Sequence, residues 1–103
     1  MGVLDPNDIQ SFINRHIDEI CGHYGVHRQI IFTSRSKDER RMNAIVTIVY
    51  FLKKHTILSH REISNIVKKD VSSISKYYKF CINLDDRIPQ HTRILQAIDT
   101  LKI

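Results

Sequence analysis

Residues 59–80, SHREISNIVKKDVSSISKYYKF, carry the side chains whose types and spacing best suit chemistry on a polyanion. Seven lysine and serine side chains lie between residues 68 and 79, with apolar residues among them. Lysine ammonium groups bind phosphates, and serine hydroxyls donate or accept hydrogen bonds to phosphates or base edges. The stretch is therefore either a solvated surface helix or a pair of helices that bind DNA.

Helix-terminus signals divide this stretch in two. Ser59 and Glu62 match the S-x-x-E capping box directly before an apolar pattern, which predicts a short helix over 60–67. Residues 68–69 form a tight connection, and Asp70 suits the N-cap of a second helix. Two short helices joined by a turn of about three or four residues are typical of the helix-turn-helix motif.

The second helix of this motif enters the major groove with its N-terminal residues nearest the bases. Here Val71 either packs inward or contacts a thymine methyl, while Ser72 and Ser73 read base edges loosely or hold phosphates. Lys76 and Lys79 are placed to reach phosphates. In the competing interpretation the serines bond to local backbone and the lysines are solvated. Helical spacing predicts Val71, Ile74, Tyr77 and Tyr78 inward, and Ser72, Ser73, Lys76 and Lys79 outward.

Two neighbouring segments add cations. The first helix of the motif crosses the DNA backbone, which places His60 and Arg61 near phosphates. The polar segment 33–41, TSRSKDERR, offers Arg35 to the adjacent minor groove, although two acidic residues within it favour a charged surface turn. The candidate DNA-binding residues are Arg35, Lys37, Arg40, Arg41, His60, Arg61, Lys68, Lys69, Asp70, Val71, Ser72, Ser73, Lys76 and Lys79.

The segments before the motif must build the core that positions it. Residues 6–23 have apolar side chains at spacings of three and four and predict an amphipathic helix, followed by a helical turn over 26–32. Ser36 and Glu39 fit a capping box for a helix over 37–54. The middle of that segment, NAIVTIVYFL, is β-branched and would also suit a strand. Its length, its flanking charges and the lack of a partner strand favour a buried central helix.

The C-terminal part supplies a closing element. Residues 83–89, NLDDRIP, interrupt the helical pattern, and a last helix is expected over 90–102. Asp85 and Asp86 are adjacent, so they are expected to cap this helix rather than to form a catalytic pair. The sequence therefore predicts one all-α domain, residues 1–103, of five or six helices.

Composition limits the class of protein. The 103 residues are 42% hydrophobic and 26% charged, which suits one domain with one core. No long uncharged apolar run and no signal-peptide pattern is present, so we expect no membrane partner and a cytoplasmic location. Cys21 and Cys81 are then expected to be buried, reduced thiols.

Positive charge is concentrated in the middle of the chain. Residues 27–79 hold twelve Lys and Arg against four Asp and Glu, whereas the rest holds four against seven. The formal net charge is +5. One basic face is expected from this distribution, and nucleic acid is the commonest partner of such a face.

The order of these segments resembles the C-terminal DNA-binding domain of the bacterial replication initiator DnaA, which has a Trp-repressor-like helical fold. The resemblance covers roughly residues 9–101. The segments that match the family are, in chain order, HYGVHRQIIF, the basic segment TSRSKDERR, a long apolar helix and REISNIV. The family then opens its recognition helix with Asp-His-Thr-Thr-Val, where this chain has DVSSI, residues 70–74.

The resemblance implies roles for individual residues. Asp70, Ser72 and Ser73 would lie at the end of the recognition helix that reads bases and holds phosphates. Arg35 would enter the minor groove, and Lys76 would extend the contacts. Val71 replaces the family's His and removes one polar base contact, while serines replace the two Thr and keep only the hydroxyls.

Other chemistry finds little support in the sequence. The initiator's ATPase requires G-x-x-x-x-G-K-[ST], which is absent, as are nucleophile motifs and spaced zinc ligands. We therefore expect no enzyme, no cofactor, no metal and no small-molecule substrate, and double-stranded DNA as the partner. The alternative is a helical protein-interaction domain with an acidic partner, docked through Tyr77, Tyr78 and Phe80.

Overall fold

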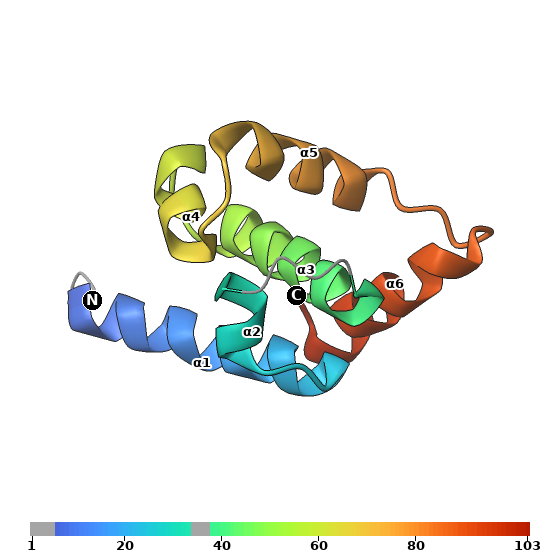
Figure 1. Cartoon of the computed structure of the whole chain (residues 1–103), viewed down its shortest axis with the longest axis horizontal. Coiled ribbons are helices and arrows are strands. Elements are labelled where there is room, and N and C mark those ends of the chain that lie inside the picture. Colours follow the sequence, from blue (N-terminus) through green and yellow to red (C-terminus); the bar gives the residue numbers. More distant parts are fainter. Residues whose placement is uncertain (1–5, 34–37) are drawn as a thin grey trace.

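A computed structural model of the chain describes residues 6–33 and 38–103, and these residues form an all-α fold (Figure 1). No strand occurs in these two ranges. The all-α prediction is therefore confirmed. The helices are α1 (Pro6–Tyr24), α2 (Arg28–Thr33), α3 (Glu39–His55), α4 (His60–Val67), α5 (Val71–Ile82) and α6 (Pro89–Leu101).

Helix α3 is the central element, and the other five helices pack around it (Figure 1). Its middle contains the β-branched run that would also have suited a strand, and Ile45, Ile48 and Val49 within it are fully buried. Burial on several sides outweighs the weak helix propensity of β-branched residues. The prediction of a buried central helix is confirmed.

The N-terminus of α3 is capped differently from the prediction. Asp38 is the N-cap, and its Oδ1 accepts hydrogen bonds from the backbone N–H of Arg40 at 2.9 Å and of Arg41 at 3.3 Å. These donors lower the pKa of Asp38. Glu39 is consequently the first helical residue and not the third, so the predicted capping box is wrong. Its other member, Ser36, lies outside the described residues.

Helix α1 is amphipathic as predicted, with Ile13, Ile17 and Ile20 buried against α3. It ends at Tyr24, and Gly25 reverses the chain with φ +68, a conformation in which glycine carries no steric cost. Nearby, burial raises the pKa of Cys21 to about 11. The prediction of a buried free thiol is confirmed there and at Cys81.

Helix α6 closes the core with Ile94 and Ala97, but it is not capped by an acidic side chain. Ile88 is the N-cap and Pro89 begins the helix. Asp85 instead accepts from the side chain of Arg87, with Oδ2 3.0 Å from Nη2. The prediction that Asp85 and Asp86 cap the last helix is wrong, because the proline fixes the first turn two or more residues further on.

Candidate nucleic-acid interface

The capping box predicted for α4 is present. Ser59 Oγ accepts a hydrogen bond from the backbone N–H of Glu62 at 3.2 Å, and Glu62 Oε1 accepts from the backbone N–H of Ser59 at 3.1 Å. Ile63 and Val67 then anchor the helix in the core. The capping box thus fixes the first residue of α4, and the burial of Ile63 and Val67 fixes which side of the helix faces the core.

Three residues connect α4 to α5. Lys68 adopts the left-handed conformation, with φ 59 and ψ 44, and the backbone N–H groups of Lys68 and Lys69 both donate to Ser64 O. This arrangement ends α4 and turns the chain. Asp70 occupies the N-cap position of α5 as predicted, but its side chain accepts no capping hydrogen bond. A helix-turn-helix connection of the predicted length is therefore present.

Helix α5 packs mainly against α3 and α4 and lies along one edge of the molecule (Figure 1). Ile74 and Cys81 are buried, and burial raises the pKa of Cys81 to about 12. Tyr77 and Tyr78 are half-buried against the core, in agreement with their predicted inward orientation. The opposite side of α5 faces away from the rest of the described chain.

That outward side carries most of the predicted contact residues. Ser72, Lys76 and Lys79 are exposed as expected. Two predictions are corrected: Val71 is 42% exposed and not inward, and Ser73 is half-buried and not outward. Val71 is the first residue of α5 and is left partly in solvent, whereas Ile74, about one turn further along the helix, is fully buried.

Exposed residues of α5 fall at positions that a groove-binding helix would use. Positions i, i+1, i+4, i+5 and i+8 share one side of a helix, and these are Val71, Ser72, Ser75, Lys76 and Lys79. Ser75, which the sequence prediction did not include, is half-buried at the edge of this side. We call these five residues the outer face of α5. Helix α5 contains no acidic residue, so its own charges are all positive.

The turn and α4 add further cations beside α5. Arg61 and Lys68 are exposed, and His60 is half-buried. Lys69 is half-buried, and its pKa is lowered by burial and then by the positive charge of Arg41, against a smaller opposite effect of Asp70. The positive charge of Arg41 therefore disfavours the charged form of Lys69, an effect that an anionic partner would offset.

The basic segment before α3 is only partly available to a partner. Arg35 and Lys37 lie outside the described residues. Arg40 is exposed, and its Nε lies 3.5 Å from Asp38 Oδ1. Arg41 is only 3% exposed, so its predicted role as a surface DNA contact is wrong. The first turn of α3 directs this side chain inward, which a linear charge pattern does not reveal.

Lys53 is a cation near α5 that the sequence prediction missed. Its Nζ lies 5.8 Å from the centroid of the Tyr78 ring, and that ring stacks on Tyr50 at 6.4 Å between centroids. A cation at this distance is attracted by the ring face. Lys53 and Tyr78 are far apart in the sequence, so no spacing signal links them. The contact places one more positive charge beside α5.

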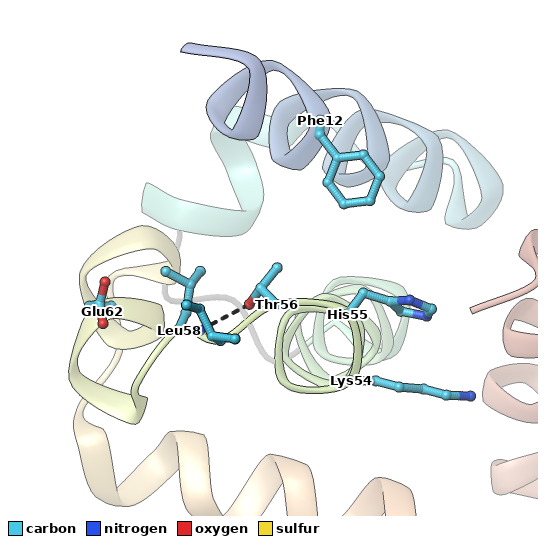
Figure 2. Close-up of a pocket in the computed structure, with 7 residues that line it drawn as sticks. Phe12, Lys54, His55, Thr56, Leu58 and Glu62 are labelled. Atoms are coloured by element: carbon cyan, nitrogen blue, oxygen red, sulfur yellow. Dashed lines mark hydrogen bonds between the residues drawn. The ribbon is translucent and has the colours of Figure 1, made fainter. Parts of the chain in front are cut away.

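A pocket of about 670 Å³ lies on another side of the fold, between α1, the C-terminal end of α3 and α4 (Figure 2). The Phe12 ring projects toward it from α1, and the connection after α3 supplies Thr56, Ile57 and Leu58. Ile57 is completely exposed. The other lining residues are Lys54, His55 and Glu62.

Three ionisable side chains, Lys54, His55 and Glu62, line the pocket beside its apolar residues. Burial lowers the pKa of His55, with smaller contributions from the charges of Lys54 and His16. Within residues 6–33 and 38–103, no three His, Cys, Asp or Glu side chains converge as metal ligands would. None of the helices described here has the length and apolar character required to cross a bilayer.

Comparison with known proteins does not place the chain in a family. No protein-family profile, no curated protein and no solved structure matches it. The class of protein is thus defined by the architecture alone: a small all-α domain with a helix-turn-helix arrangement at one edge.

Proposed function

We propose that this protein is a duplex-DNA-binding module that places α5 in the major groove and α4 across the DNA backbone. One observation carries this proposal: the outer face of α5 has four exposed residues of five, lacks acidic residues and ends in two exposed lysines, Lys76 and Lys79. Major grooves admit an α-helix, and lysines beside it contact phosphates. The module would act by binding and not as an enzyme.

The surroundings of α5 support this orientation. The backbone N–H groups of its first turn donate no hydrogen bond to the Asp70 side chain, and a helix N-terminus attracts anions. Arg61 and Lys68 lie on the preceding helix and turn, where a helix-turn-helix protein meets the backbone. Phosphate contacts would supply most of the affinity, and Ser72 with its neighbours on α5 would supply selectivity.

The resemblance to the DNA-binding domain of DnaA extends the proposal to a biological role. On that basis the module would be bacterial and cytoplasmic, and it would bind origin-type boxes in replication initiation or its regulation. The order of helices and the DVSSI segment support this role. Val71 in place of the family's His favours a box that differs from the standard one at the facing base pair.

Fluorescence anisotropy with labelled duplexes tests the proposal. We expect tighter binding to a duplex carrying a DnaA-type box, or to a related box, than to a scrambled duplex, and weaker binding to both as salt rises. Equal, salt-sensitive binding to both would keep the DNA-binding function and reject the origin-box role. Absence of binding to any duplex at low salt would reject the function itself.

A second candidate function is a protein-interaction domain with an acidic partner. The pocket favours it, because Phe12, Leu58 and the completely exposed Ile57 line one hollow, and a contiguous exposed apolar patch marks a docking surface. Phe80 is 39% exposed, whereas Tyr77 and Tyr78 are half-buried and serve the core. Nucleic acid retained on the purified protein, removable by nuclease and a high-salt wash, would favour DNA over this alternative.

A further inference from the structure

Val71 is an apolar side chain at the position where a groove-binding helix meets the bases. It is the first residue of α5 and is 42% exposed. The packing of α5 does not require it, because Ile74 and Cys81 are the buried residues of this helix. The other four residues of the outer face of α5 are serines and lysines, so Val71 is its apolar member, while the exposed apolar residues Phe80 and Ile82 lie at the C-terminal end of the helix.

We propose that Val71 contacts the 5-methyl group of a thymine and thereby selects an A·T pair at one position of the target, an inference that rests on the proposed DNA-binding function. The methyl of thymine is the apolar feature that the major-groove edges of the four bases present. A valine cannot donate or accept a hydrogen bond, so it gains nothing from the polar edges of guanine, adenine or cytosine. Burial of two apolar surfaces against each other is its one favourable contact there.

The neighbours of Val71 are consistent with reading a single base pair. Ser72 is the next residue around the same exposed side, and its hydroxyl is placed to bond to the polar atoms of the same or the adjacent pair. Ser73 is half-buried, so it is less available for this task. Lys76 lies one turn further along and is exposed, where it would hold a phosphate.

Deoxyuridine substitution provides a direct test. Uracil keeps every hydrogen-bonding atom of thymine and lacks only the methyl group. Preferred duplexes would first be selected from random sequence, and each thymine would then be replaced by deoxyuridine, one at a time. With the wild-type protein, we expect one position at which the replacement weakens binding about fourfold, the loss equivalent to one buried methyl group.

Two variants separate a methyl contact from a general effect. Val71→Ala should bind the thymine duplex more weakly and should bind the thymine and uracil duplexes alike at that position. Arg15→Ala is the matched control, because Arg15 is an exposed residue of α1, outside the proposed interface, and this variant should keep the fourfold preference for thymine. Both substitutions replace exposed side chains, so circular dichroism and the urea midpoint should be unchanged.

The outcomes of this experiment distinguish the inference from the function on which it rests. If no duplex is selected and none binds at low salt, the DNA-binding function and the inference both fail. If duplexes bind but every deoxyuridine replacement is neutral, the thymine contact is rejected and DNA binding stands. The thymine contact is likewise rejected if Val71→Ala keeps the thymine preference of the wild type.

Discussion

Removal of the two lysines of α5 should change the salt dependence of DNA binding by a calculable amount. Each phosphate neutralised by a protein cation contributes about −0.9 to the slope of log K against log salt. Four exposed cations, Arg61, Lys68, Lys76 and Lys79, and the half-buried Lys69 and Lys53 lie on or beside the α4–α5 region. About six contacts give a slope near −5, so a fourfold rise in salt should lower the affinity about a thousandfold.

The double variant Lys76→Ala/Lys79→Ala should therefore show a slope closer to −3.5, because two of about six contacts are lost. The slope is obtained from anisotropy titrations at several salt concentrations between about 50 and about 200 mM. Arg15→Ala is the matched control, since Arg15 is an exposed cation on α1, which lies on the other side of α3 from α5 (Figure 1). This control should leave the slope unchanged.

Two results would refute this reasoning. If Arg15→Ala reduces the slope as much, per charge, as the lysine substitutions do, the net charge of the molecule governs binding and not the face that contains α5. If neither variant changes the slope, α5 does not contact phosphates and the placement of this helix in the groove is wrong. Retained helicity by circular dichroism would show that the variants are folded.

Three further predictions concern the scaffold. Tyr24→Phe should lower the free energy of unfolding by about 1 kcal/mol, because Thr47 gives its hydroxyl proton to Asn43 O and so accepts from the buried Tyr24 hydroxyl at 2.8 Å; an unchanged urea midpoint would contradict this. Ser59→Ala should also lower the free energy of unfolding by about 1 kcal/mol, because it removes the capping box of α4. Urea denaturation measures this change, and an unchanged free energy of unfolding would mean that the capping box does not stabilise the fold. Burial raises the pKa of Cys21 to about 11 and that of Cys81 to about 12, so both thiols should contribute stability that is complete below pH 9.0. This stability should be lost as the pH rises, up to about pH 11 for Cys21 and about pH 12 for Cys81, by at most about 1.4 kcal/mol per pH unit for each thiol. A double Cys→Ala variant should show a flatter alkaline profile of the urea midpoint, and an identical profile would reject this cause.

Local signals in the sequence were sufficient to predict the two helices of the helix-turn-helix motif and the turn between them. The capping box of Ser59 and Glu62 lies within four residues, and its two hydrogen bonds form as predicted. The bounds 60–67 for α4 agree with the structure because the cap fixes the start and Lys68 fixes the end. Similar reasoning failed at α3, where Ser36 was the predicted cap and the structure has Asp38 in that position.

The candidate interface was less predictable, because exposure depends on what distant segments cover. Arg41 and Arg40 are adjacent in the sequence, yet one is buried and the other exposed. Lys53 became a neighbour of α5 through the ring of Tyr78, a contact between two helices that no local pattern encodes. A charge count identified the basic region correctly but could not say which of its cations face solvent.

The sequence by itself determined the helical class, the two short helices and the excess of positive charge around them, because caps, apolar periodicity and charge act over a few residues. The tertiary structure alone decided which side of α5 is available to a partner. The central helix α3 takes Ile74 and Cys81 into the core and leaves Val71 in solvent. The physical reason is that burial is a property of packed elements, so the same apolar residue type serves the core at one position of α5 and faces outward at another.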